Sequence, residues 1–170
     1  MKTDECNNTI YRILHEAFLR NQVTFATGIP CGGQKVIIQN ILADGRITHV
    51  ACTKESEAIG LSAGAFLAGR QPLVYMQNSG LFGCSNDIAS LLIPFRLSIL
   101  MIVTWRGIPG EDAPQHLVTG SATIALLEAL GVPYRILTIE SAEHVVDDLM
   151  VQMRRDWLPG ALLIRKGWER

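Results

Sequence analysis

The sequence predicts an α/β fold: a three-layer α/β/α sandwich with a roughly six-stranded parallel sheet. Apolar, strand-like segments alternate with helical segments along the chain, the order expected when helices connect parallel strands. One strand-like segment, 97–104, is almost wholly apolar, as a strand buried on both faces should be. The composition agrees, because 48% of the residues are apolar and 18% are charged.

The first part of the chain contains two expected helices and two expected strands. Segment 9–20 repeats apolar residues at helical spacing, and 23–26 reads as a short strand. A second helical period covers 34–42 and ends before Gly45. Segment 47–52 is the next expected strand.

The middle of the chain opens with a helix that is rich in glycine, alanine and serine, expected over 55–68. Segment 72–77 is the following strand, and 78–80 reads as a polar turn. A further helix is expected over 84–92, where Pro94 ends it.

The last third continues the alternation. A helix is expected over 118–130 with Gly131 as its stop. Strand 134–139, helix 141–155 and strand 161–165 complete the pattern. No internal repeat or linker interrupts it, so we expect one domain over 1–170.

Composition also excludes several classes of protein. The net charge is −1 without a basic stripe, so a nucleic-acid partner is not expected. The longest apolar run, 97–105, is shorter than the roughly 20 residues that span a bilayer. The amino terminus has no apolar stretch like that of a signal peptide, and we expect a cytoplasmic protein without membrane contact. The four cysteines have no metal-ligand spacing, which predicts free thiols and no metal site.

Polar residues concentrate where the expected strands end. These places are the glycine-rich segment 28–33, the acid Glu55, segment 77–80, and 105–107 with its extension to 115–116. Because the carboxyl ends of parallel strands share one edge of a sheet, we expect these segments to converge there.

Other site chemistries find little support in the sequence. No phosphate-binding Gly-x-x-x-x-Gly-Lys-Ser/Thr loop and no Gly-x-Ser-x-Gly elbow is present. A thiol nucleophile built from Cys31 or Cys84 with His116 stays open as an alternative. The other histidines, His15, His49 and His144, are expected to lack partners.

The chain resembles the pyrimidine-binding (Pyr) domain of thiamine diphosphate enzymes, and among these the phosphonopyruvate and sulfopyruvate decarboxylases. The resemblance runs from about Phe25 to Leu137. The motifs that carry it, in order along the chain, are Gly28–Gly33, the Glu55 run with Ala58, Ser62 and Gly64, Met76–Leu81 with Asn86, Trp105–Gly107 with Pro109–Gly110, and Pro114–His116.

The resemblance implies roles for individual residues. In this family an acid at the position of Glu55 hydrogen-bonds N1′ of the cofactor's aminopyrimidine, and a carboxylate in a water-poor niche is able to share a proton with a ring nitrogen. The resemblance implies Glu55 and His116 as catalytic residues. The implied cofactor-binding residues are Gly28, Ile29, Pro30, Glu55, Gln77, Asn78, Ser79 and Asn86. The implied substrate-binding residues are Cys31, Arg106, Gln115 and His116.

One family motif is missing. Thiamine diphosphate enzymes hold the diphosphate and Mg²⁺ through Gly-Asp-Gly and a later Asn-Asn pair. The one Asp-Gly of this chain, Asp44-Gly45, is preceded by Ala43, and no Asn-Asn pair follows it. The resemblance therefore implies an α subunit that binds no metal and shares thiamine diphosphate with a β subunit, which carries the diphosphate and Mg²⁺ site, in a hetero-oligomer. The implied substrate is phosphonopyruvate or a similar anionic 2-oxo acid such as sulfopyruvate.

Alternatives remain at this point. A carboligase or decarboxylase for another 2-oxo acid fits the same motifs. A non-catalytic regulatory subunit is favoured by Cys31 and Phe82, where relatives usually have an acid and a glycine. Glu55 is also explained as an ordinary acid at a helix amino terminus, and Arg106 as a partner of Glu111 or Asp112.

Overall fold

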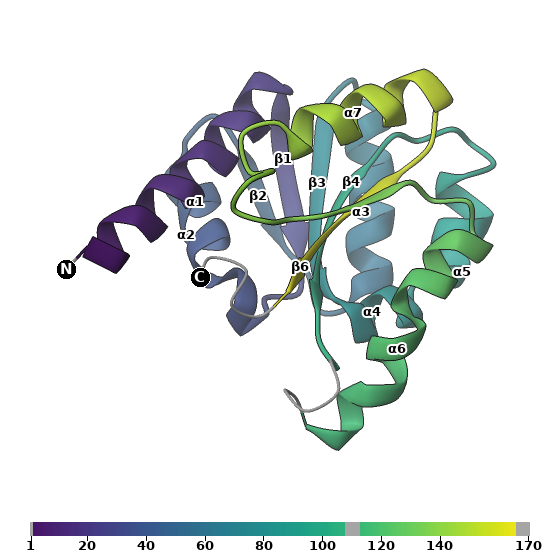
Figure 1. The fold of residues 1–170 in the computed structure, drawn as a ribbon. Helices are drawn as coiled ribbons and strands as arrows, with labels where there is room; N and C mark the ends of the chain where they lie inside the picture. The colour runs from purple at the N-terminus through teal and green to yellow at the C-terminus, as the bar shows by residue number, and fades with distance from the viewer. Residues whose placement is uncertain (1, 108–112, 166–170) are drawn as a thin grey trace.

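The computed structural model describes residues 2–107 and 113–165, and for residues 2–8 it describes the backbone alone. In this part of the chain, a central parallel sheet has helices on both faces (Figure 1). The strands are β1 (Val23–Gly28), β2 (Thr48–Ala51), β3 (Gln71–Gln77), β4 (Leu100–Trp105), β5 (Tyr134–Ile136) and β6 (Gly160–Arg165). The helices are α1 (Lys2–Arg20), α2 (Lys35–Ala43), α3 (Glu55–Leu67), α4 (Asn78–Gly83), α5 (Ser85–Asp87), α6 (Pro114–Ala129) and α7 (Val145–Asp156), with a 3₁₀ turn η1 (Gly32–Gln34) and a π-helical turn η2 (Ile88–Leu92).

The strand order is β2-β1-β3-β4-β6-β5, and every pairing is parallel. The expected three-layer α/β/α architecture with a six-stranded parallel sheet is thereby confirmed. The order reverses direction between β1 and β3, so the chain leaves these two strands toward opposite sides. Ligands of open α/β sheets bind at such a switch point, beyond the carboxyl ends of the strands.

Alternate residues along β3, β4 and β6 face two separate cores, because successive strand side chains point to opposite faces. In β4, Leu100 and Ile102 pack with α1, α2 and α7. Met101 and Val103 pack with α3, α4 and α6 on the other face. All six residues of β4 are buried, which explains why this strand is apolar without alternation.

Two elements near the carboxyl edge of the sheet differ from those predicted from the sequence. Segment 78–80, expected as a polar turn, is the first half of helix α4. Helix α6 begins at Pro114, four residues before its expected start, so Gln115 and His116 lie in its first turn and not in a loop. Pro114 suits this position because a first-turn residue needs no N–H donor.

Other boundaries differ by less consequential amounts. Helix α1 extends back to Lys2, and the helix expected over 84–92 divides into α5 and the π-helical turn η2. Strand β5 ends at Ile136, three residues before its expected end. None of the described helices is both long and apolar enough to cross a membrane.

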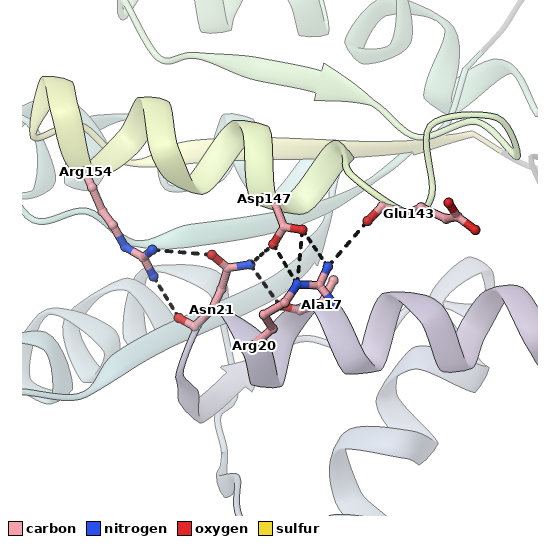
Figure 2. Close-up of polar contacts among 6 residues, drawn as sticks. All are labelled: Ala17, Arg20, Asn21, Glu143, Asp147 and Arg154. Atoms are coloured by element: carbon pink, nitrogen blue, oxygen red, sulfur yellow. Dashed lines mark hydrogen bonds and ion pairs between the residues drawn. The ribbon is translucent and has the colours of Figure 1, made fainter.

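Polar contacts join the first and last long helices, as Figure 2 shows. The guanidinium of Arg20 donates to Oδ2 of Asp147 at 2.5 Å, and the side-chain amide of Asn21 also donates to Asp147. Arg154 in turn donates to the backbone carbonyl of Asn21 at 2.9 Å. We call these four residues the α1–α7 clamp. It ties the end of α1 to α7 across more than a hundred residues of intervening chain.

Candidate active site

The carboxyl edge of the sheet brings together the ends of three adjacent strands and the starts of three helices. Strands β1, β3 and β4 end here, and helices α3, α4 and α6 begin here (Figure 1). The amino end of a helix carries unpaired N–H groups and a partial positive charge. Three such ends and several polar side chains thus surround one edge of an otherwise apolar sheet.

Glu55 is the first residue of α3, as expected, and its side chain is half-buried. Its carboxylate has no hydrogen-bond or ion-pair partner among residues 2–107 and 113–165. The carboxylate lies directly against Gly80 of α4, where a Cβ atom would overlap with it. Gly80 therefore leaves the space that Glu55 occupies.

Glu57, two residues further on, behaves differently. Its carboxylate accepts hydrogen bonds from the backbone N–H of Thr53 at 2.7 Å and from the Thr53 hydroxyl at 2.9 Å. These two hydrogen bonds hold the pKa of Glu57 below its ordinary value. The acid that stabilises the entry to α3 is therefore Glu57, and Glu55 is not used for that purpose.

Gln77, the last residue of β3, contacts three of the other expected site residues. Its Oε1 accepts a hydrogen bond from Sγ of Cys31 at 3.6 Å. Its Nε2 lies 2.8 Å from Oγ of Ser79 and 3.4 Å from Nδ1 of His116. The structure thus brings Cys31, Gln77, Ser79 and His116 together, from the β1–α2 loop, β3, α4 and α6.

Asn78 is completely buried, and its side chain is engaged by the protein itself. Its Nδ2 donates to the backbone carbonyl of Arg106 and to Oγ1 of Thr123, both at 3.0 Å. Its Oδ1 accepts from the backbone N–H of Arg106 at 3.2 Å. Both amide hydrogens are therefore used to tie α4 to the end of β4 and to α6. Sequence reasoning missed Thr123, which has no signal of its own inside an apolar helix.

Gly28 allows close packing at the end of β1. It has a φ of +152°, and a Cβ atom here would overlap with the backbone and ring of Tyr75. The backbone N–H of Ile29 donates to the carbonyl of Tyr75 at 3.0 Å, and Pro30 is exposed. The Tyr75 hydroxyl reaches Nε2 of His49 on β2 at 2.7 Å.

Two of the three histidines expected to lack partners, His15 and His49, have them. His49 pairs with Tyr75 as described, and burial lowers the pKa of His49. His15 on α1 lies 2.7 Å from Oδ2 of Asp44, far from the carboxyl edge. Spacing along the chain gave no signal for either pair, because each partner lies more than twenty residues away.

Asn86 and Gln115 have no described contact with Glu55 or with the residues around Gln77. Asn86 is exposed on α5, where its Oδ1 accepts from the Ser90 hydroxyl at 3.2 Å. Gln115 is exposed in the first turn of α6, next to His116. Glu111 and Asp112, the alternative partners of Arg106, and the motif residues Pro109–Gly110 lie outside the described residues.

Of the two cysteines considered as thiol nucleophiles, Cys84 is excluded by its burial. Cys84 is fully buried, and burial together with the nearby carboxylates of Asp87 and Glu55 raises the pKa of its thiol to about 12. A thiol of this kind stays protonated and is a poor nucleophile. Cys31 is partly exposed, but its described hydrogen bond goes to Gln77 and not to a histidine.

A further cationic side chain, which sequence reasoning did not single out, lies at this edge of the sheet. Arg165 ends β6, and its guanidinium lies 4.4 Å from the centre of the Trp105 ring. The indole of Trp105 donates to the carbonyl of Gly120 at 2.8 Å. Within the described residues, no group of three or more histidine, cysteine, aspartate or glutamate side chains is arranged to hold a metal ion.

Comparison with known proteins identifies relatives over most of the chain, although no family model matches it. The chain is 36% identical to the sulfopyruvate decarboxylase subunit alpha of Methanococcus maripaludis over 121 residues, covering 71% of this chain and 72% of the relative. It is 38% identical to the subunit of the same name from Methanothermobacter thermautotrophicus, covering 66% and 68%. It is 37% identical to phosphonopyruvate decarboxylase of Streptomyces viridochromogenes, of which it covers 29%.

A solved structure shares the fold. A chain of the 2-oxoglutarate:ferredoxin oxidoreductase from Magnetococcus marinus superposes with a TM-score of 0.69 at 14% identity, covering 94% of this chain and 29% of that one. The resemblance expected from the sequence motifs is confirmed by the sequence relatives. The chain belongs to the family of sulfopyruvate decarboxylase alpha subunits and phosphonopyruvate decarboxylases.

Proposed function

We propose that the chain is the pyrimidine-binding half of a two-subunit, thiamine-diphosphate-dependent decarboxylase of 2-oxo acids. The observation that carries the proposal is the Glu55 carboxylate, which opens α3 against Gly80 and has no partner among the described residues. A half-buried carboxylate left unpaired by residues 2–107 and 113–165 is suited to share a proton with a bound heterocycle.

The residues at the edge fit an aminopyrimidine. Glu55 offers a carboxylate to a ring nitrogen, and Gly28–Pro30 lie at the end of β1, the strand that pairs with β2 just before Glu55. When bound, thiamine diphosphate supplies the electron sink for loss of carbon dioxide. The proposed role of this chain is to hold the pyrimidine ring and to keep a proton at Glu55. We assign Asn78 a positioning role, because its amide hydrogens are already used.

The proposed substrate is an anionic 2-oxo acid such as sulfopyruvate or phosphonopyruvate. The relatives carry the names of enzymes for these two acids. Arg106, directly after β4, is of the residue type that matches sulfonate or phosphonate oxygens through paired hydrogen bonds. His116 and Gln115 in the first turn of α6 are proposed to contact the same acid, with Cys31 on the facing loop.

A β subunit is proposed to hold the diphosphate and Mg²⁺, in a hetero-oligomer with this chain. Several relatives are named alpha subunits, which supports a second chain. The sequence lacks the diphosphate motif, and a hard cation needs oxygen ligands from elsewhere. A single Pyr-type domain over 1–170 and a cytoplasmic location belong to the same proposal, the latter resting on cysteines without pairing spacing.

The test is decarboxylation of sulfopyruvate and phosphonopyruvate by this chain mixed with a candidate β chain that carries Gly-Asp-Gly and Asn-Asn. Glu55→Gln should lower kcat by about 10²- to 10⁴-fold, because a general acid–base group is lost without a change in size. Glu57→Gln is the matched control, since Glu57 serves Thr53 instead. Equal rates for Glu55→Gln and the unmodified chain would show that the catalytic assignment of Glu55 is wrong.

A further inference from the structure

Gln77 lies at the centre of a hydrogen-bond network, and both hydrogens of its side-chain amide are used in it. Its Oε1 accepts from the Cys31 thiol, and its Nε2 has Oγ of Ser79 and Nδ1 of His116 within hydrogen-bond distance. An amide nitrogen has two hydrogens, and two acceptors are present for them. Gln77 is therefore placed to orient its neighbours, with no donor left over for a ligand.

The orientation of this amide follows from the chemistry of its neighbours. With Oε1 toward Cys31, a strong acceptor meets a weak S–H donor, one N–H group meets the Ser79 oxygen, and the other meets Nδ1 of His116, which accepts in one of the two neutral tautomers. With the amide reversed, its two N–H groups would point at a sulfur, which is a weak acceptor. The orientation in the structure thus satisfies more of the amide's hydrogen-bonding capacity.

This orientation determines where the hydrogen of a neutral His116 ring must lie. The Nε2 atom of Gln77 only donates, so Nδ1 of His116 must accept, and the ring hydrogen is then on Nε2 of the histidine. The ring nitrogen left for a ligand is therefore an N–H group. In this state, His116 is able to donate a hydrogen bond to a substrate but not to accept a proton from it.

We infer that Gln77 is a positioning residue that fixes His116 as the Nε2–H tautomer, so that the imidazole meets an anionic 2-oxo acid as a hydrogen-bond donor. The tautomer itself depends only on contacts within this chain. The donor role toward a 2-oxo acid rests on the proposed function.

The tautomer is measured directly by long-range ¹H–¹⁵N correlation spectra of the full ¹⁵N-labelled chain. The spectra are recorded at about pH 8, where an ordinary imidazole is neutral. The chain has four histidines, and the signals that disappear in His116→Gln belong to His116. We expect a pyridine-type Nδ1 and a pyrrole-type Nε2. A pyrrole-type Nδ1 in the unmodified chain would overturn the inference.

Three substitutions test whether Gln77 is the cause. In Gln77→Glu the carboxylate only accepts, and in Cys31→Asp a carboxylate attracts the amide N–H groups and turns Oε1 toward His116. Both changes should move the ring hydrogen to Nδ1. Cys31→Ser is the matched control, because a hydroxyl still donates to Oε1 and the signals should stay as in the unmodified chain. Circular dichroism establishes that each variant is folded, and folded Gln77→Glu and Cys31→Asp chains with unchanged His116 signals contradict the inference.

The donor role is tested in the complex with the β chain. Loss of one hydrogen bond to a charged group should raise KM for the 2-oxo acid about tenfold in Gln77→Glu. An unchanged KM in a variant with an inverted tautomer would refute the donor role. Absence of turnover in the unmodified complex would count against the proposed function instead, while the spectra would still decide the role of Gln77.

Discussion

At the scale of single residues, the position of the Glu55 carboxylate depends on the absence of a side chain at Gly80. The carboxylate occupies the space that a Cβ atom of residue 80 would need. Small shifts of a catalytic group are costly, because a misplacement of about 1 Å is able to lower a rate by about a hundredfold. The proposed site thus requires a residue without a side chain at position 80.

Gly80→Ala should lower kcat about a hundredfold, because the added methyl group pushes the Glu55 carboxylate away from its place. The chain should still fold, since alanine favours helix and the displaced group is the end of a flexible side chain. Decarboxylation by the reconstituted complex measures this. Gly83→Ala in the same helix is the control, because a Cβ atom there meets no neighbour within 4 Å. Equal losses in both variants would show that α4 itself is perturbed.

The sequence indicated which residues gather at the edge but not what each contacts. Cys31, Gln77, Ser79 and His116 were all expected there, and the structure joins them. The direction of the Asn78 side chain was not predictable, because it depends on tertiary packing against α6.

At the scale of elements, α6 packs on the segment after β4 through direct backbone contact. Gly107, with a φ of +90°, faces the carbonyl of His116 and the Cα of Gly120. A Cβ atom on Gly120 would overlap with the carbonyl of Gly107, and the Trp105 indole donates to the carbonyl of Gly120. The two glycines therefore determine how closely the helix that carries His116 approaches the sheet.

Gly120→Ala should destabilise the chain by about 1–3 kcal/mol, because the neighbouring atoms are backbone and do not move aside easily. Urea unfolding followed by circular dichroism measures the change. Ser121→Ala on the exposed side of α6 is the control and should stay within about 0.5 kcal/mol. A Gly120→Ala chain as stable as the control would mean that α6 is free to move away from the sheet.

Hydrophobic patterning predicted all six strands. The apolar side chains of β1, β3, β4 and β6 lie in the two cores, and the edge strand β2 is only partly buried. It failed at the carboxyl edge, where polar residues form helices. Segment 78–80 is helical although its residues favour turns, since burial of Asn78 and Leu81 outweighs local preference. The early start of α6 was missed because proline occurs both in loops and in the first turn of helices, and Pro114 takes the helical position here.

At the scale of the whole molecule, the α1–α7 clamp joins the carboxyl end of α1 to α7 (Figure 2). Burial raises the pKa of Asp147, but hydrogen bonds from Arg20 and Asn21 lower it more, so the net pKa lies below the ordinary value. The folded state thus favours the ionised carboxylate. No periodicity in the sequence reveals this contact, because its members are 126 to 133 residues apart.

Asp147→Asn should lower the free energy of unfolding by about 1 kcal/mol at neutral pH, a modest value because Arg20 and Asp147 are partly exposed. The stabilisation from a carboxylate with a lowered pKa is present above the unfolded value of about 3.9 and is lost as pH falls through the folded value. Urea unfolding at several pH values below about 5 should therefore show a weaker pH dependence in Asp147→Asn. Asp148→Asn, exposed and one residue away, is the control. Parallel pH curves for the unmodified chain and Asp147→Asn would exclude the clamp as a source of acid sensitivity.

The central claim is that Glu55 faces the pyrimidine of a cofactor whose diphosphate is held by another chain. The most direct measurement is a crystal structure of this chain with its β chain, thiamine diphosphate and Mg²⁺. We predict a carboxylate oxygen of Glu55 at about 2.6–3.2 Å from a ring nitrogen of the pyrimidine, with the metal and diphosphate on residues of the β chain. A structure in which the Glu55 carboxylate points away from the ring, or in which this chain holds the metal, would contradict the account.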